Sequence, residues 1–403
     1  MFDYIDMMKK LSVKNDGKIV LVVMDGLGGC ETEDGGKTEL EMAKTPNLDE
    51  LARGGTLGLS DPIAPGFTPG SGPAHLSLFG YDPVKYNIGR GILAAAGIGF
   101  PLESSDVAAR GNYCTVDDSG AVTDRRAGRI PTDKNAELCA ILDGIEVNGV
   151  RAYVRAVKEH RCVIIFRGEG LHGDLTDSDP QVTGKKPIPI SANSAASEKM
   201  AGIANAFLAE AFKRLAGSHP ANGLLLRGFD AVPHLPQMPE VTKLTPAAVA
   251  VYPDYKGISR LVGMKVIEVG GESIKEEIDA LAANWANHDF FYLHVKKTDS
   301  SGEDGNFAKK VSVIEEFDSL LPGIMSLKPD VVAVTGDHST PALLKAHSWH
   351  PVPLLLNSQF CRRDASKEFS ERACSQGGLG RIPAVSLMPL MLANSLKLLK
   401  FGA

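Results

Sequence analysis

Three aspartates that are far apart in the sequence each follow a short apolar run. Asp25 comes directly after KIVLVVM, Asp337 comes after VVAVT and one glycine, and Asp299 follows FFYLHV and three more residues. Carboxylates brought to one place repel one another unless a positive charge lies between them. A pair of divalent metal ions is the simplest source of that charge, so these residues predict a metal centre.

Histidines accompany the third aspartate. His338 follows Asp337 directly, and His347 lies nine residues after His338. A single Asp-His pair is usually a surface or hydrogen-bonded feature, but two further aspartates at the same kind of strand end favour metal binding here. Mixed carboxylate and imidazole ligands suit Mn, Zn or Co better than Ca or Mg. Mn is our first expectation, with Zn, Co or Mg as alternatives.

Ser71 is the predicted nucleophile. It lies in DPIAPGFTPGSGP at 61–73, where glycines leave room for a phosphate or a metal beside the backbone. A serine hydroxyl attacks near neutral pH only if it is acidified or deprotonated, and coordination to a metal acidifies it. A turn serine without chemistry is the alternative interpretation. Neither GxxxxGK[ST] nor a GxGxxG after a strand is present, so we expect no nucleotide cofactor.

The apolar runs are the elements that must position these side chains. Short runs rich in Val and Ile, without alternation, are typical of buried strands in a parallel sheet. Ligands of open α/β sheets bind beyond the carboxyl ends of such strands. A helix over 307–321 would cross over between two parallel strands. The sequence therefore predicts an α/β core with a mostly parallel central sheet and helices on both faces.

The chain of 403 residues is longer than one core usually serves. Residues 96–254 differ in composition from the rest of the chain, with clustered arginines and a proline-rich return segment. The predicted strands that end at an aspartate lie on both sides of this region in the sequence. We predict a metal-binding catalytic domain formed by 1–95 and 255–403, with a smaller α+β domain inserted at 96–254. The apolar stretch 383–401 is predicted to form one amphipathic helix that closes the fold, with a helix on a membrane surface as the alternative.

Composition argues against several classes of protein. The net charge of −6 is unfavourable for a nucleic-acid surface, and no apolar run reaches the length of about 18 residues that spans a membrane. The six cysteines form no CxxC pair, and the N-terminal MFDYIDMMKK lacks the apolar segment of a signal peptide. These features predict a cytoplasmic protein with neither a nucleic-acid partner nor a membrane span.

Five motifs together carry a family resemblance. They are DGLGG at 25–29, TPNLDELA at 45–52, TPGSGPAHLSLFGYDP at 68–83, KKTDSSGEDGNF at 296–307 and GDHSTP at 336–341. As a set they resemble the cofactor-independent (2,3-bisphosphoglycerate-independent) phosphoglycerate mutases of the archaeal type, within the alkaline phosphatase superfamily. The resemblance covers nearly the whole chain and is weakest in the insert. It implies a glycolytic isomerase with an alkaline phosphatase-like core that needs no 2,3-bisphosphoglycerate.

The resemblance also implies roles for individual residues. One metal would be held by Asp25, Ser71, Asp337 and His338, and the other by Asp299, Glu303 and His347. Ser71 would take the phosphoryl group of 3-phosphoglycerate as phosphoserine, and the retained glycerate would accept it on its 2-hydroxyl.

Position 303 departs from the family pattern. The family usually has DxxGH, with a histidine four residues after the aspartate, whereas this chain has Glu303. Glutamate can ligate through oxygen and makes the site more anionic, so we expect a metal preference moved toward Mn or Mg. His294 or His350 could replace it as a ligand.

The substrate that the resemblance implies is a small phosphorylated three-carbon acid, and bidentate arginine suits both its carboxylate and its phosphate. Arg110 and Arg129 in the insert are the preferred pair, with Arg90 and Lys296 expected nearer the metals. Ordinary surface arginines are the alternative interpretation. A lid that carries these arginines would close over the metals and exclude water.

Two other functions remain open. The same two-metal serine site serves phosphomonoester hydrolases and phosphodiesterases, and Glu303 motivates a non-catalytic metal-binding scaffold. A simple phosphatase has less need of a large arginine-bearing insert, and a scaffold has no reason to keep Ser71 in a glycine loop. Phosphopentomutases also carry an insert, but their motifs differ.

Overall fold

The computed structural model describes residues 2–31 and 36–402. Its contacts divide the chain into two compact units. Unit 1 is Met1–Asn87 together with Leu235–Ala403, and unit 2 is Ile88–His234. Unit 1 carries the three aspartates, and unit 2 carries the arginine cluster.

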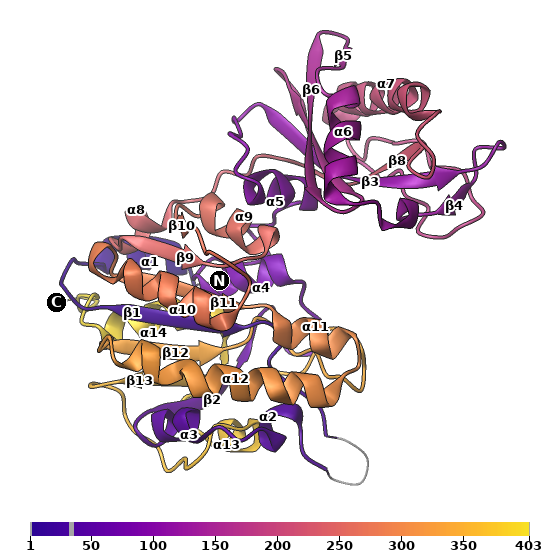
Figure 1. Cartoon of the computed structure of the whole chain (residues 1–403). Coiled ribbons are helices and arrows are strands. Elements are labelled where there is room, and N and C mark those ends of the chain that lie inside the picture. The colour runs from indigo at the N-terminus through magenta and orange to yellow at the C-terminus, as the bar shows by residue number, and fades with distance from the viewer. Residues whose placement is uncertain (1, 32–35, 403) are drawn as a thin grey trace. The chain divides into compact units, whose positions relative to one another are not determined.

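Unit 1 contains a mixed, mostly parallel sheet (Figure 1) with the strand order β10-β9-β11-β1-β12-β13-β2-β14. Its strands are β1 (Ile19–Met24), β2 (Thr56–Asp61), β9 (Pro246–Val249), β10 (Lys265–Ile267), β11 (Phe290–Val295), β12 (Val331–Thr335), β13 (Val352–Ser358) and β14 (Gly380–Pro383). The central strand β1 pairs in parallel with β11 and β12, whereas β13 is antiparallel to both of its neighbours. The predicted fold class is confirmed.

The three central strands are buried along their whole length, which is what continuous apolar runs predict. Their register aligns the strand ends. Met24 of β1 lies beside Val295 of β11, and Val23 lies beside Thr335 of β12. The residues that follow the three strands therefore leave the sheet at the same edge.

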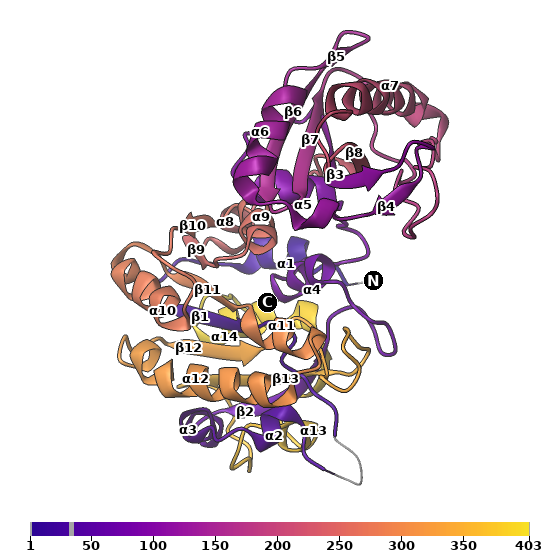
Figure 2. The ribbon, with the colours of Figure 1, turned by 45° about the vertical axis from the view of Figure 1, so that its right-hand side comes forward.

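Helices cover both faces of this sheet (Figures 1 and 2). One face shares an apolar cluster with α2 (Glu39–Met42), α3 (Pro46–Arg53), α10 (Ile274–Ala283), α12 (Phe307–Met325) and α13 (Glu371–Ser375). The remaining helices of unit 1 are α1 (Tyr4–Leu11), α4 (Ser71–Leu78), α8 (Met238–Thr242), α9 (Pro253–Leu261), α11 (Lys297–Glu303), η3 (Trp285–Asn287), η4 (Ala384–Ser386) and α14 (Leu387–Asn394). Among the described residues, no helix combines the length and the apolar character needed to cross a membrane.

Helix α12 illustrates how the sequence forms these elements. The side chain of Asn306 caps the first turn by accepting a hydrogen bond from the backbone N–H of Lys309 at 3.0 Å. Phe317 and Leu321 lie at helical spacing and are buried in the cluster beneath the sheet. The strands β11 and β12 are both parallel to β1 and lie on either side of it. Helix α12 therefore belongs to the crossover between two parallel strands that is predicted for 307–321.

The single helix predicted for 383–401 is wrong. Helix α14 spans only Leu387–Asn394, and the chain then turns so that Leu398 pairs with Ser12. Lys397, which the amphipathic pattern would place in solvent, is buried and donates to a backbone carbonyl near the N-terminus at 2.7 Å. Pairing with a segment that is distant in sequence ends the helix, and local periodicity carries no information about such pairing.

Unit 2 is an α+β unit with an antiparallel sheet of order β4-β3-β7-β6-β5, in which β8 also pairs with β3. Its elements are α5 (Arg90–Gly97), β3 (Asp106–Val116), β4 (Val122–Asp124), η1 (Ala127–Arg129), α6 (Thr132–Leu142), β5 (Glu146–Val147), β6 (Val150–Lys158), β7 (Arg161–Arg167), η2 (Ala195–Ser197), α7 (Glu198–Leu215) and β8 (Gly223–Ala231). Helices α6 and α7 share an apolar cluster with this sheet.

The unit boundaries differ from the predicted domain boundaries of 96 and 254. Helix α5 belongs to unit 2, because Gly91 lies so close to the backbone of Ala108 on β3 that a side chain would not fit. Strand β9 belongs to unit 1, because it pairs in parallel with β11. Arg90, at the start of α5, is therefore a residue of unit 2.

Glu277 on α10 gives unit 1 a pH-dependent stability. Its side chain is buried, and Oε1 has no hydrogen-bond partner among the residues described. Burial raises the pKa of Glu277 from its ordinary value of 4.5 to about 8, although Lys297 opposes the shift. The unfolded chain therefore loses this proton first as the pH rises, and the native state is progressively destabilised between these two values.

We expect Glu277→Gln to raise the free energy of unfolding by about 2 kcal/mol near pH 7.5 and by much less near pH 5. Urea titrations of both proteins at the two pH values measure this difference. An equal gain at both pH values would point to packing instead, and no gain near pH 7.5 would contradict an ionisation cost.

Candidate active site

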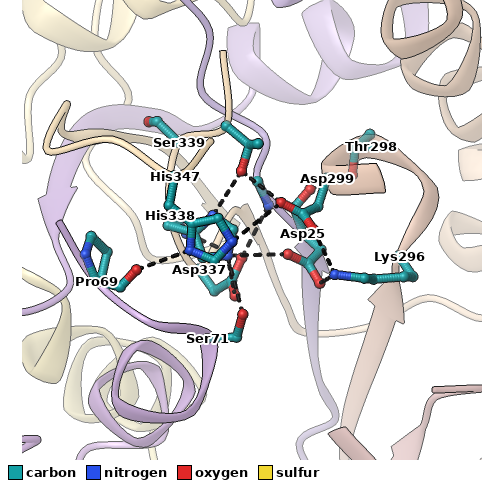
Figure 3. Close-up of polar contacts among 12 residues, drawn as sticks. Asp25, Pro69, Ser71, Lys296, Thr298, Asp299, Asp337, His338, Ser339 and His347 are labelled. Atoms are coloured by element: carbon teal, nitrogen blue, oxygen red, sulfur yellow. Dashed lines mark hydrogen bonds and ion pairs between the residues drawn. The ribbon is translucent and has the colours of Figure 1, made fainter. Parts of the chain in front are cut away.

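The candidate active site lies at the edge of the unit 1 sheet where β1, β11 and β12 end (Figure 3). Asp25 follows β1 directly, and Asp337 follows β12 after one glycine. Asp299 lies in the first turn of α11, which begins just after β11. All three side chains are buried, at 0%, 0% and 1% exposure respectively. The structure thus brings together the three aspartates on which the sequence argument depends.

His338 faces a group of oxygen atoms (Figure 3). Its Nε2 lies 3.2 Å from Ser71 Oγ, 3.3 Å from Asp25 Oδ1 and 3.2 Å from Asp337 Oδ2. Within the described parts of the chain, neither of those two carboxylate oxygens has a hydrogen-bond partner, although both are buried. Buried polar atoms are normally satisfied, so this geometry is the one that a bound cation would complete.

A second group adjoins the first. The ligand atoms of Asp299, His338 and His347 lie within 4.8 Å of one another. The His347 Nε2 is 3.6 Å from Asp299 Oδ1 and 3.8 Å from Glu303 Oε1, while its Nδ1 donates to the carbonyl of Pro69 at 3.0 Å. Asp299 and Glu303 are four residues apart on α11, so they share one face of the helix. The Glu303 side chain is 55% exposed.

Lys296 is the fixed positive charge of the site. Its Nζ donates to Asp299 Oδ2 at 2.6 Å, to Asp25 Oδ2 at 3.0 Å and to the hydroxyl of Tyr255 at 3.1 Å. Burial opposes the charged form, but Asp25 and Asp299 outweigh it and raise the pKa of Lys296. The predicted substrate role of Lys296 would therefore be combined with an ion-pair role.

One lysine does not neutralise three buried carboxylates. Burial opposes ionisation of Asp25, but Lys296 and then His294 hold its pKa well below the ordinary value. Burial, followed by the charges of Asp25 and Asp299, raises the pKa of Asp337 well above its ordinary value. The opposite pKa shifts of Asp25 and Asp337 reflect the repulsion between carboxylates that the sequence predicts. Additional positive charge would offset this repulsion.

Ser71 is the first residue of α4 and is half-buried. The first N–H groups of a helix have no partner within the helix and favour an anion there, such as a phosphate. His75, one turn later, is buried and donates from Nδ1 to the Ser71 carbonyl at 2.8 Å. Burial lowers the pKa of His75 to about 3. His75 therefore supports the start of the helix that presents Ser71.

His294 and Tyr255 belong to the surroundings of Asp25, and sequence reasoning assigned neither of them there. His294 Nε2 is 3.1 Å from Asp25 Oδ2, and the Tyr255 ring stacks on His294 with centroids 3.6 Å apart. His350 instead lies beside Cys30, with Nε2 and Sγ 3.5 Å apart. Neither histidine is in the two ligand groups found among the described residues. A histidine inside an apolar strand needs a polar partner, and this signal points to His294.

Unit 2 contains a pocket of about 170 Å³ that is rich in arginine. Its lining is Arg90, Arg110, Asn112, Arg125, Arg126, His160, Arg161 and Arg227. Arg90 and Arg110 were proposed from the sequence as substrate ligands. Arg129 is exposed on η1 and does not line this pocket as far as the described residues go.

Two features of this pocket have no signal in the sequence. Arg125 is held by a bidentate ion pair with Asp179, at 2.9 and 2.6 Å, and Arg227 lies 3.4 Å from the same carboxylate. His160 is buried, and burial together with Arg161 lowers its pKa to about 4. The pocket therefore presents fixed guanidinium groups beside a neutral imidazole, which suits an anion that also carries hydroxyl groups.

Comparisons with known proteins agree with one another. A family model described as 2,3-bisphosphoglycerate-independent phosphoglycerate mutase matches residues 52–222. A relative from Thermus thermophilus, named a probable mutase of this kind, is 52% identical over the full length of both chains. Among solved structures, a Pyrococcus horikoshii protein has a TM-score of 0.84 and 30% identity, covering 96% of this chain and 99% of its own.

A cofactor-independent phosphoglycerate mutase from Thermoplasma acidophilum has a TM-score of 0.73 and 31% identity, covering 94% of this chain and all of its own. The similarity extends through both units, including the insert in which the sequence motifs are weakest. With a full-length relative at this level of identity, the chain belongs to the 2,3-bisphosphoglycerate-independent phosphoglycerate mutase family.

Proposed function

We propose that this protein interconverts 3-phosphoglycerate and 2-phosphoglycerate through a phosphoserine at Ser71, as a step of glycolysis. The names of its relatives support the mutase activity. The single observation that carries the phosphoserine is the position of the Ser71 hydroxyl. Ser71 is the first residue of helix α4, and its Oγ lies 3.2 Å from His338 Nε2. Ser71 Oγ would form a bond to phosphorus as the bond to the 3-oxygen breaks, with a net transfer of the serine proton to that oxygen. The 2-hydroxyl would later attack the phosphoserine as the bond to Ser71 Oγ breaks, and its proton would return to the serine.

The donor set fits two divalent metal ions, with Mn as the first choice. The fit rests on the buried, unpartnered oxygens of Asp25 and Asp337 and on the mixture of carboxylate and imidazole donors. The residues that would hold the two ions are Asp25, Ser71, Asp337 and His338 for one, and Asp299, Glu303 and His347 for the other. When bound, such ions supply Lewis-acid stabilisation of phosphoryl oxygens and acidify a hydroxyl.

The protein's own groups account for the remaining requirements. The start of α4 favours negative charge at Ser71, and the Lys296 ammonium donates hydrogen bonds to both Asp25 and Asp299 and lowers the pKa of Asp25. Arg90 and Arg110 in the unit 2 pocket would bind the carboxylate or the phosphate. Retention of the glycerate is what separates a mutase from a phosphatase, since the phosphoserine must meet the 2-hydroxyl before it meets water.

Product analysis tests the proposal. Purified protein is incubated with Mn²⁺ and 3-phosphoglycerate, and the product is measured both with enolase as coupling enzyme and as inorganic phosphate. Enolase-dependent product without phosphate release supports the mutase. Phosphate release without 2-phosphoglycerate favours a hydrolase, and neither product, with Mn²⁺ still bound, favours a non-catalytic scaffold.

Glu303 allows a separate prediction about the second metal ion. Glu303→Gln keeps an oxygen donor but removes its charge, so Mn²⁺ binding at this site is expected to weaken by at least about 10-fold. Isothermal titration with Mn²⁺ measures both sites, and Asp304→Asn, which neutralises the exposed neighbour, is the matched control. Wild-type protein that binds only one ion, or a Glu303→Gln variant that binds two ions unchanged, would remove Glu303 from the ligand set.

A further inference from the structure

Thr340 lies between the two candidate ligand groups and is fully buried. Its hydroxyl donates to Asp299 Oδ1 at 2.7 Å and is 3.0 Å from His338 Nδ1. Asp299 belongs to one ligand group, and His338 is shared with the group that contains Asp25 and Asp337. A single side-chain oxygen thus contacts both groups, although it is not itself in either of them.

The single proton of the Thr340 hydroxyl determines which ring nitrogen of His338 is protonated. A threonine hydroxyl has one proton, and Thr340 donates it to the Asp299 carboxylate oxygen in the 2.7 Å hydrogen bond. The hydroxyl can then only accept from His338, which places a proton on Nδ1. The other ring nitrogen, Nε2, is the atom that faces Ser71, and its lone pair is left for a metal.

The backbone keeps space for this hydroxyl. Gly26 has a left-handed φ of 65°, and a Cβ at this position would lie 2.4 Å from Thr340 Oγ1. A Cβ at Gly302 would lie 2.2 Å from the Thr340 carbonyl oxygen. The glycines of the DG and DSSG motifs therefore both make room for the threonine of DHST. Lys310 Nζ donates a hydrogen bond to the same carbonyl oxygen at 2.9 Å, which holds the backbone of Thr340 in place.

We infer that Thr340 is a positioning residue that couples the two metal sites, by holding His338 as the Nδ1–H tautomer and by orienting Asp299. The inference rests on the proposed metal centre. Residues that orient metal ligands through hydrogen bonds typically contribute about 10- to 100-fold to metal affinity. Because one hydroxyl serves both groups, its loss should weaken both sites rather than one.

Two substitutions separate the hydroxyl from the shape of the side chain. Thr340→Val keeps the shape and removes the hydrogen bonds, and Thr340→Ser keeps the hydroxyl. In titrations with Mn²⁺ alone, Thr340→Val is expected to lose about 10- to 100-fold in affinity at both sites, whereas Thr340→Ser should stay within about 3-fold of the wild type. Thr242→Val, which removes another buried hydroxyl that donates to the Met238 carbonyl, should bind as the wild type does. Equal affinity of Thr340→Val and the wild type would overturn the inference.

A second measurement keeps the inference testable if Thr340→Val does not fold. Ring ¹⁵N shifts of His338 in the metal-free protein, assigned by comparison with His338→Gln, report which nitrogen carries the proton. The Nδ1–H form is expected in the wild type and in Thr340→Ser, and an Nε2–H form would overturn the inference. If the wild-type protein bound no Mn²⁺, the proposed function would fail, and the ring shifts would still decide whether Thr340 sets the tautomer.

Discussion

Replacement of Ser71 by alanine is expected to lower kcat for phosphoglycerate interconversion by at least about 10⁴-fold. The substitution removes the hydroxyl at the start of α4 that lies 3.2 Å from His338 Nε2, so no phosphoserine can form. It leaves the helix in place, because alanine is a good helix former and the contact of His75 is to the backbone carbonyl of residue 71. The loss should therefore appear in kcat and not in the stability of the fold.

The control for this variant is Ser77→Ala, which removes a hydroxyl from the same helix at a buried position. Its kcat should stay within about 3-fold of the wild type. Acid quenching during turnover, followed by peptide mass analysis, should find phosphate on Ser71 in the wild type. A Ser71→Ala enzyme with more than a tenth or so of wild-type activity would exclude the phosphoserine route.

Neutralisation of Asp337 is expected to have opposite effects on the metal-free and the metal-loaded protein. In Asp337→Asn, Oδ1 can still accept from the backbone N–H groups of Gly26 and His338, which both lie 3.1 Å away. The variant removes a buried carboxyl whose pKa is raised by burial and by Asp25 and Asp299. A raised pKa costs native stability as the pH rises and the unfolded chain ionises, so the metal-free variant should be more stable than the metal-free wild type at neutral pH.

The same variant should lose the stabilisation that bound Mn²⁺ gives to the wild type. Mn²⁺ at about 100 times its Kd would stabilise the wild type by about 2.7 kcal/mol, and this increment should largely disappear in Asp337→Asn. We expect kcat/KM to fall by at least about 10³-fold. Thermal unfolding with Mn²⁺ and with a chelator measures both effects, with chelator-treated wild type as the reference. An Asp337→Asn protein that is less stable than metal-free wild type, yet still stabilised by Mn²⁺, would contradict a metal role for this carboxylate.

The central sheet could be predicted from the sequence because its strands are buried on both faces. The bounds of β11 and β12 coincide with their apolar runs, and the convergence of Asp25, Asp299 and Asp337 follows from parallel strands that end at one edge. The unit boundaries were harder to predict. Helix α5 is rich in glycine and alanine, and strand β9 is short, so neither has a pattern that assigns it to one core or the other.

The ligand groups could be predicted from residue types, whereas the residues around them could not. Asp, His and Ser at strand ends indicate chemistry by themselves. The roles of Thr340, His294 and Tyr255 depend on burial and on hydrogen bonds or ring stacking between segments far apart in the chain. The unit 2 pocket illustrates the same limit. Arg227 of β8 joins the arginine cluster because it pairs with Arg110 of β3, and His160 joins it from the turn between β6 and β7.

The position of β1 in the sheet has a consequence for the synthesis of this protein. Ile19 of β1 pairs with Phe290 and with Val331, so its two neighbours leave the ribosome long after it does. Unit 2 is continuous in sequence, and all its strands emerge before β11. Until then six consecutive apolar residues of β1 lack their neighbours, and exposed segments of this kind promote aggregation. The nascent chain therefore carries an unpaired apolar strand from the synthesis of β1 until that of β11, even after its insert is complete.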